Sequence, residues 1–330
     1  MSFKKKLLIG TLVTFLLAAG GVTYYFFNLY QEAEKAVTES YQDLERGEHS
    51  EQREEEVDPS EDNISILFVG VDDSDTRQGT SSLADALVLA TFNKDDLSVN
   101  MVSIPRDSYV DVSYQYSKDK INHTHGFGGL DETVSVVEDL LDVPVDYYVR
   151  LDFMAFVDTV DALGGVDFDV PYYLEETDST DQGTVVIQPG EQTLNGEEAL
   201  AMARTRQHDN DLERGNRQME ILESIIDQTL SFSSITRYNS LIQSIGDRMT
   251  TNISFDQLVS LHEYVTGNDG LEIEQHQLEG NDLWANDIYY FDLDERSISD
   301  ISKELRTHLQ IDSQYVEAKK DEEENEDQGL

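Results

Sequence analysis

The sequence predicts an α/β domain in which helices cover a β-sheet. Short apolar runs such as Ile64–Val71 are typical of buried strands, and they alternate along the chain with longer segments of helical periodicity. Phe153–Leu163 is one such helix, and the pair Gly164-Gly165 ends it. Strands that alternate with helices indicate a layered α/β arrangement.

The same patterns place the other elements of a domain that we expect to span residues 63–316. Ala84–Phe92 and Leu97–Ile104 are two strands joined by the turn Asn93–Asp96. Further strands are expected at Tyr147–Leu151, Val166–Val170, Thr184–Ile187, Leu271–Leu278 and Ile288–Leu293. Further helices are expected at Leu130–Leu141, Gly196–Arg204, Asp211–Phe232, Ile235–Met249, Ser254–Thr266 and Ile298–Leu309.

An apolar run from Leu7 to Phe27 precedes this domain. As a helix it would be about 31 Å long at ~1.5 Å per residue, which is enough to cross a bilayer core. Three lysines, Lys4–Lys6, lie before the run. We therefore expect a single N-terminal transmembrane helix at 7–27, with residues 1–6 in the cytoplasm and the domain outside the cell. A signal peptide cleaved near Ala18-Ala19-Gly20 is the alternative.

Composition narrows the function further. The chain has 68 acidic and 23 basic residues, a formal net charge of −45, so binding to nucleic acid is not expected. It has no cysteine, which excludes disulfides and thiolate metal sites. Residues 28–62 are rich in glutamate and predict a solvated acidic stalk, and the acidic tail 317–330 predicts disorder.

Within this acidic chain, four arginines lie close together between residues 204 and 217. They are Arg204, Arg206, Arg214 and Arg217. Guanidinium groups bind phosphate bidentately and stay charged, so the group suits a phosphate site. The alternative is pairing with their acidic neighbours Asp209, Asp211 and Glu213, and composition alone leaves both interpretations open.

Three further segments carry polar residues near the ends of predicted strands. Arg106 and Asp107 follow Pro105, which ends a strand, so they should lie on a loop at the edge of the sheet. Asp72 and Asp85, on neighbouring strands, could hold a hard cation through oxygen ligands. Lys120–Gly129 is a glycine-rich loop that could bind an anion through its amides. Taken singly, each segment also fits an ordinary turn or a solvated acid.

Together and in this order, the segments resemble the LytR–CpsA–Psr family over most of Ile64 to about Ile226. The resemblance rests on Gly70-Val71-Asp72, Asp85, Ser103–Asp107, Lys120-Ile121-Asn122 with Gly128-Gly129, Tyr147–Phe153, Val160–Val166, Leu194–Arg206 and Asp211-x-x-Arg214-x-x-Arg217-Gln218. It implies a central mixed β-sheet flanked by helices, with an apolar lipid tunnel between sheet and helices. Helix Phe153–Leu163 is our candidate for part of the tunnel wall.

The resemblance also implies a reaction and its partners. Family members transfer a glycopolymer of the teichoic acid or capsular polysaccharide type, with its phosphate, from undecaprenyl pyrophosphate to peptidoglycan. The expected partners are therefore a polyprenyl-pyrophosphate-linked glycopolymer, peptidoglycan and the membrane that holds the N-terminal helix. A lipid pyrophosphate hydrolase and a non-catalytic wall-associated regulator are the alternatives.

Residue roles follow from the matched motifs. The resemblance implies that Asp72 and Asp85 bind Mg²⁺, with Mn²⁺ as an alternative. It implies that Arg106, Lys120, Arg204, Arg206, Arg214, Arg217 and Gln218 line the pyrophosphate site, with Arg106, Arg204 and Arg206 as catalytic residues. Asp107 adjoins Arg106 and is our candidate for the base that accepts the proton of the sugar hydroxyl. Leu83 and Ala86 depart from the family pattern, which has an arginine and a polar residue there, and Arg77 is a candidate substitute.

Overall fold

The computed structural model describes residues 24, 27–28, 30–47, 49–72, 82–115, 117–208, 210–230, 248–266 and 271–311. The expected span 7–27 lies outside them except at residues 24 and 27, as do most of the expected helix Ile235–Met249, the loop residue Arg77 and the tail 317–330. Within the described part of the chain, no helix has the length and apolar character needed to cross a membrane.

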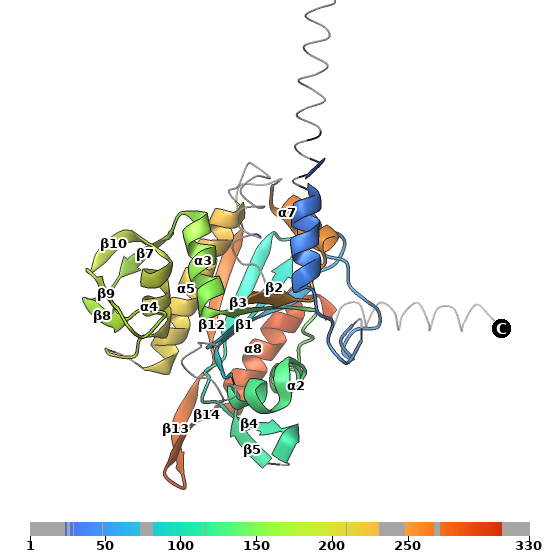
Figure 1. Ribbon diagram of the computed structural model, residues 1–330. Coiled ribbons are helices and arrows are strands. Elements are labelled where there is room, and N and C mark those ends of the chain that lie inside the picture. Colours follow the sequence, from blue (N-terminus) through green and yellow to red (C-terminus); the bar gives the residue numbers. More distant parts are fainter. Residues whose placement is uncertain are drawn as a thin grey trace, which may run out of the picture.

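A six-stranded mixed sheet forms the centre of the domain (Figure 1), as the resemblance predicts. Its strands are β1 (Ile64–Val71), β2 (Ala84–Asn93), β3 (Ser98–Ser103), β6 (Tyr147–Asp152), β11 (Met249–Thr251) and β12 (Glu272–Gln277), in the order β11-β6-β1-β2-β3-β12. β1 is parallel to β6 and antiparallel to β2, which is in turn antiparallel to β3. The carboxyl ends of β1, β3 and β6 therefore meet at one edge of the sheet, where open α/β sheets commonly bind ligands.

Helices cover both faces of this sheet. They are α2 (His123–Leu141) and α8 (Glu295–His308) on one face, and α5 (Asp211–Leu230) and α7 (Phe255–Thr266) on the other. Leu67 and Leu89 pack in the core shared with α2 and α8, whereas Ile66 and Met101 pack in the core shared with α5 and α7. The two cores follow from the alternation of side chains along each strand.

A smaller unit lies beside α5 (Figure 1). It contains α3 (Phe153–Leu163), α4 (Gly196–Arg204), the strand pair β7 (Val166–Val170) and β10 (Gly190–Leu194), and the strand pair β8 (Leu174–Thr177) and β9 (Thr184–Ile187). Asn195 and Glu198 form a capping box that starts α4. A Cβ atom on Gly196 would lie 2.3 Å from the Val157 carbonyl oxygen, so this glycine lets α4 pack closely on α3.

Two small antiparallel pairs lie at the edge where the parallel strands end. β4 (Tyr109–Val112) pairs with β5 (Ser117–Lys120), with the 3₁₀ helix η2 (Ser113–Gln115) between them, and β13 (Gly280–Ala285) pairs with β14 (Ile288–Leu293). Ser108 forms an isolated bridge with Phe291, which joins the second hairpin to the loop after β3. Figure 1 shows the β13–β14 hairpin projecting from the body, at the end away from the helical segment 30–40.

The segment before β1 corrects the expectation of a solvated stalk at 28–62. Ala33 and Val37, one helical turn apart, are buried, and Leu44 joins the core under α2. Arg53 Nη2 lies 2.6 Å from Asp146 Oδ2, and both side chains are almost inaccessible to solvent. The glutamates of this segment dominate its composition and conceal a narrow apolar stripe that packs on the domain.

The predicted elements are otherwise confirmed within the described residues, with shifts of a few residues at some ends. The largest difference concerns α2, which begins at His123 and not at Leu130. Gly129 has a φ of 76° and interrupts the helix, so most of the expected glycine-rich loop forms the first turns of a kinked helix. Strands β4, β5, β8, β10, β11 and β13 were not anticipated, because each is short and most are polar. Met249, expected at the end of a helix, instead begins β11.

Candidate active site

A tight turn after β3 places the first two site residues. The Pro105 carbonyl accepts hydrogen bonds from the backbone N–H of Ser108, at 3.0 Å, and from its hydroxyl, at 2.6 Å. Arg106 and Asp107 occupy the two central positions of this turn. The backbone N–H of Phe291 donates to the Asp107 carbonyl at 2.8 Å, so the β13–β14 hairpin holds the turn in place.

Asp85 lies at a β-bulge that directs its side chain to the same turn. Val71 pairs with Ala84 whereas Gly70 pairs with Ala86, which leaves Asp85 as the extra residue of β2. Bulges bend a strand and can redirect a side chain. The Asp85 carboxylate accepts a hydrogen bond from Arg106 Nη1.

Lys120, at the end of β5, completes this side of the site. Its Nζ donates to Asp107 Oδ1 at 2.7 Å, and Arg106 Nε lies 3.8 Å from Asp107 Oδ2. Asp107 thus lies between two cations, and its own side chain is nearly buried.

Helix α5 brings the other side of the site to this turn. A Cβ atom on Gly215 would lie 2.5 Å from Ser103 Oγ, so the absence of a side chain lets α5 approach the end of β3 closely. Asp211 and Arg214, one turn apart near the start of α5, then face the turn. Asp211 Oδ1 lies 3.2 Å from Arg214 Nη1 and 3.0 Å from Arg206 Nε.

The charges of the two sides interact. The Asp107 and Asp211 carboxyls share a hydrogen bond. Burial opposes ionisation of Asp107, but hydrogen bonds from Lys120 and Asp211 outweigh it and lower the Asp107 pKa. Burial, together with the hydrogen bond to Asp107, raises the pKa of Asp211 despite the nearby Arg214. The two carboxyls therefore titrate as a pair, with Asp107 ionised first.

Arg214 is the most enclosed cation of the cluster, with only 5% of its surface exposed. Burial lowers its pKa to about 10, with Asp211 opposing this shift and Arg206 and Arg106 adding to it. Arg214 remains positively charged at neutral pH. The Nε atoms of Arg106 and Arg214 are buried and have no hydrogen-bond partner among the residues that the structure describes. Unsatisfied buried donors of this kind suit an anionic ligand.

Arg204 does not join this cluster. Its Nη2 atom hydrogen-bonds the Thr177 carbonyl, the Thr177 hydroxyl at 2.8 Å and the Asp178 carbonyl at 2.9 Å. Arg204 therefore links the end of α4 to the end of β8.

Arg217 and Gln218 lie at the junction between α4 and α5. Arg217 donates to the carbonyls of Met202, at 2.9 Å, and Thr205, at 2.7 Å. Gln218 Nε2 donates to the Ala203 carbonyl at 3.0 Å. These carbonyls belong to the last turn of α4 and the residue after it, where no intrahelical donor is available. The two side chains thus hold the segment that carries Arg206.

Asp72 and Asp85 lie at the same edge of the sheet. Asp72 directly follows β1, Asp85 lies in the bulge opposite the end of β1, and the register pairs Val71 with Ala84 between them. Asp72 is buried. Two carboxylates at one edge of the sheet form a donor set that suits Mg²⁺, which usually keeps a few protein carboxylates, water and phosphate oxygens as ligands. Arg106 would share the Asp85 carboxylate with such an ion.

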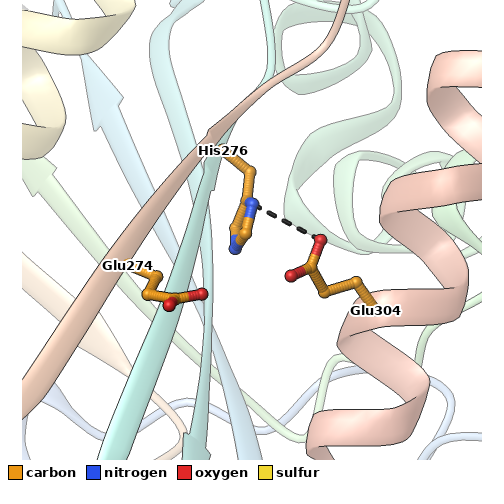
Figure 2. Close-up of side chains that lie close together, drawn as sticks. All are labelled: Glu274, His276 and Glu304. Carbon is orange, nitrogen blue, oxygen red and sulfur yellow. Dashed lines mark ion pairs between the residues drawn. The ribbon is translucent and has the colours of Figure 1, made fainter.

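A second group of metal-ligating side chains lies on the edge strand β12. Figure 2 shows Glu274 and His276 on this strand and Glu304 on α8, directed toward one another. His276 Nδ1 lies 3.5 Å from Glu304 Oε2. Both glutamates are exposed, and β12 is separated from β2 by β3. We assign these residues an ion pair on the surface and no part in the active site.

The structure therefore brings together Arg106, Asp107, Lys120, Arg206, Arg214 and Asp85 of the residues predicted from the sequence, and it places Asp72 at the same edge. Sequence reasoning considered Asp211 only as an ion-pair partner and missed its contact with Asp107. It also missed Tyr289 on β14, whose ring centroid lies 5.9 Å from Lys120 Nζ. Asp211 belongs to a matched motif that could have revealed it, whereas no local signal marks Tyr289.

Comparison with known proteins gives consistent matches. Residues 24–307 match the model of the LytR_cpsA_psr family. The polyisoprenyl-teichoic acid–peptidoglycan teichoic acid transferase TagT of Bacillus subtilis (strain 168) is 39% identical over 310 residues, which cover 93% of this chain and 94% of TagT. TagU of the same organism, named as a transferase of the same kind, is 36% identical over 314 residues, which cover 93% of this chain and 97% of TagU.

Solved structures of the same family are also similar to this chain. The structure of TagT bound to LIIa-WTA has a TM-score of 0.69 and 39% identity, and covers 81% of this chain and 99% of the TagT chain. The structure of the LytR-CPS2A-psr family protein YwtF (TagT) with bound octaprenyl pyrophosphate lipid has a TM-score of 0.64 and 36% identity, with the same coverage.

Proposed function

Because the chain belongs to the LytR–CpsA–Psr family, we propose that it is a phosphotransferase that moves a glycopolymer from polyprenyl pyrophosphate to peptidoglycan. The observation that supports this most directly is the cluster of Arg106, Arg206, Arg214 and Lys120 at the carboxyl ends of β1 and β3. In a chain with a net charge of −45, four converging cations indicate an anionic ligand. Partly buried guanidinium groups suit the oxygens of a pyrophosphate.

The cluster can support the transfer of a phosphoryl group. The oxygen of an acceptor sugar hydroxyl attacks the phosphorus that carries the glycopolymer, and the bond from this phosphorus to the bridging oxygen breaks. Polyprenyl monophosphate leaves with the bridging oxygen and its electron pair. Arg106, Arg206 and Arg214 stabilise the negative charge that develops on the departing oxygen. We propose that Arg204 also stabilises this charge. To do so, its side chain would leave its hydrogen bonds at the end of β8 and bind a phosphate oxygen instead.

The hydroxyl proton needs an acceptor, and we assign this role to Asp107. Its lowered pKa keeps it ionised at neutral pH, so it can accept the proton, and its titration is linked to that of Asp211. Arg217 and Gln218 act by holding the α4–α5 junction that positions Arg206.

We assign Mg²⁺, or Mn²⁺ in its place, to Asp72 and Asp85. The ion would neutralise charge on the pyrophosphate oxygens when bound. Asp72 and Asp85 themselves supply the oxygen ligands, and Arg106 fixes the position of the Asp85 carboxylate.

The lipid tail of the donor requires an apolar site, and we propose that it lies between the sheet and helices α3 and α5. Several apolar side chains there are only partly buried, namely Phe68, Val149, Leu151, Phe156, Leu222, Ile225 and Ile226. Gly70 and Ala86, which pair on the α5 side of the sheet, carry no bulky side chain there. An apolar tail would complete the burial of these side chains.

The predicted span 7–27 would place this domain on the outer side of the cell membrane, where both substrates occur. C-terminal fusions to alkaline phosphatase and to a fluorescent protein should give phosphatase activity without cytoplasmic fluorescence. Bright cytoplasmic fluorescence without phosphatase activity would contradict this orientation.

The test of the function is a transfer assay with the full chain. A polyprenyl-pyrophosphate-linked glycan donor, peptidoglycan oligosaccharides and Mg²⁺ should yield a phosphodiester-linked product and polyprenyl monophosphate. Free glycan phosphate without the linked product would instead identify a hydrolase. Arg296→Ala is a suitable control, because Arg296 is an exposed arginine that pairs with Asp300 on α8. Equal transfer by the Arg296→Ala and Arg206→Ala variants would refute the assignment of the cluster.

A further inference from the structure

The β13–β14 hairpin presents exposed aromatic side chains next to the active site. Trp284 on β13 is 68% exposed, and its ring centroid lies 5.5 Å from that of Tyr289 on β14. The two residues are directly opposite in the hairpin register, so they share one face. A largely exposed tryptophan on a projecting hairpin contributes little to the core, and exposed apolar surface of this kind often marks a binding site.

At its other end, the same face of the hairpin lies next to the active site. Phe291 lies two residues after Tyr289 on this face and donates its backbone N–H to the Asp107 carbonyl. Lys120, which contacts the Asp107 carboxylate, lies at the base of the hairpin, with its Nζ 5.9 Å from the Tyr289 ring centroid and 5.7 Å from that of Tyr290 on the other face of β14. The aromatic surface therefore runs outward along the hairpin from the proposed base.

We propose that Trp284, Tyr289 and Asp282 bind the glycan strand of the peptidoglycan acceptor, an inference that rests on the proposed transferase function. The faces of aromatic rings carry partial negative charge and attract the polarised C–H groups of a sugar ring. The Asp282 carboxylate accepts a hydrogen bond from the Tyr289 hydroxyl at 3.0 Å and has further lone pairs for sugar hydroxyls. A glycan strand held in this way would place one of its sugar hydroxyls beside Asp107.

Charge and position argue against two other occupants. The hairpin and its flank carry the exposed carboxylates of Asp282, Asp287, Asp292 and Asp294. These repel both the phosphates of an anionic glycopolymer and anionic lipid headgroups, but not the hydroxyl and acetamido groups of a glycan. The hairpin also lies at the end of the molecule away from segment 30–40 (Figure 1), which follows the predicted membrane span.

Trp284 is the single tryptophan of the chain, so tryptophan fluorescence reports on this surface directly. The full chain, held in phosphatidylcholine nanodiscs, would be titrated with peptide-free oligosaccharides of alternating N-acetylglucosamine and N-acetylmuramic acid whose lactyl carboxyl groups are amidated, so that the probe is uncharged. We expect a saturable change in emission with these oligosaccharides and none with poly(glycerol phosphate). No change at oligosaccharide concentrations that saturate transfer overturns the proposal. A change produced only by poly(glycerol phosphate), or only by phosphatidylglycerol in the disc, overturns it in favour of the donor polymer or the membrane.

Variants provide a second readout. Trp284→Ala should raise the acceptor KM about tenfold, equivalent to about 1.4 kcal/mol, without a comparable change in the donor KM. Trp284→Phe keeps an aromatic face and should recover most of the loss. Tyr173→Ala is the matched control, because Tyr173 is 48% exposed and lies directly before β8. Equal acceptor KM values for Trp284→Ala and Tyr173→Ala would overturn the glycan assignment even if transfer is confirmed. If the unaltered chain shows no transfer, the proposed function fails, and the fluorescence titration still decides whether the hairpin binds glycan.

Discussion

Replacing Arg206 by alanine separates a catalytic role from a structural one. Arg206 Nε lies 3.0 Å from Asp211 Oδ1, and its side chain is 37% exposed. An ion pair with that exposure contributes about 0.2–1 kcal/mol to stability. Since 1 kcal/mol shifts the Tm of a domain of this size by roughly 2–4 °C, Arg206→Ala should lower the Tm by no more than a few degrees.

The effect of Arg206→Ala on transfer should be much larger. Loss of one preorganised donor to a developing oxyanion typically costs about 10²–10³ in kcat, or about 2.7–4 kcal/mol. Arg206→Lys keeps the charge but loses the planar fork, so it should restore transfer only in part. The assay measures single-turnover transfer with saturating donor, beside the Tm of each variant. Because Arg206 also lowers the pKa of Asp211, rates should be compared across several pH values. Transfer within about threefold of the unaltered rate, at a similar Tm, would show that Arg206 forms a surface ion pair without catalytic function.

Four further outcomes follow from the site. Lys120→Met removes a cation that lowers the Asp107 pKa, so this pKa should rise. The ascending limb of the pH profile of kcat/KM should then move to higher pH. An unchanged profile would exclude Asp107 as the base. Asp85→Asn should raise the Mg²⁺ concentration needed for half-maximal transfer, as a metal titration would detect. Arg217→Ala should destabilise the fold by about 1–3 kcal/mol for each carbonyl left without its donor, measured by denaturant unfolding. Arg204→Ala should lower the Tm as well as transfer, because it removes three hydrogen bonds at the end of β8, and an unchanged Tm would show that these bonds do not contribute.

The sequence predicted the sheet and most helices because their apolar periodicity is strong. It also identified the arginines of residues 204–217 as unusual, but not the direction of each side chain. The direction of each side chain depends on the break between α4 and α5, because the residues of α5 do not continue the helical spacing of α4. Asp211 and Arg214 face the loop after β3, whereas Arg217, one turn further along α5, faces the end of α4. Arg204 and Arg206 are two residues apart and point to different partners for the same reason.

Other features depend on contacts between distant segments, which local patterns do not reveal. The bulge at Asp85 follows from the register of β1 against β2, and the two strands each look regular alone. The β13–β14 hairpin carries polar residues such as Asn281 and Asp282 where an apolar alternation would have marked a strand. Segment 30–57 contains few apolar residues, yet they meet the domain because they lie on one side of a short helix and the turn after it.

The attachment of segment 30–57 has a consequence for how the enzyme would work at a bilayer. Arg46 pairs with Glu138 at 2.6 Å, Arg53 pairs with Asp146, and Leu44 is buried, so the chain is fastened to the domain almost from the point where the predicted span ends. If residues 7–27 span the membrane, a domain attached in this way would have little freedom to swing relative to the bilayer. Its reaction centre would stay at a nearly constant height above the lipid surface, and the polyprenyl substrate would have to rise to that height while the wall approaches from the opposite direction. The length of lipid drawn out of the bilayer would then be set by the rigid body of the protein.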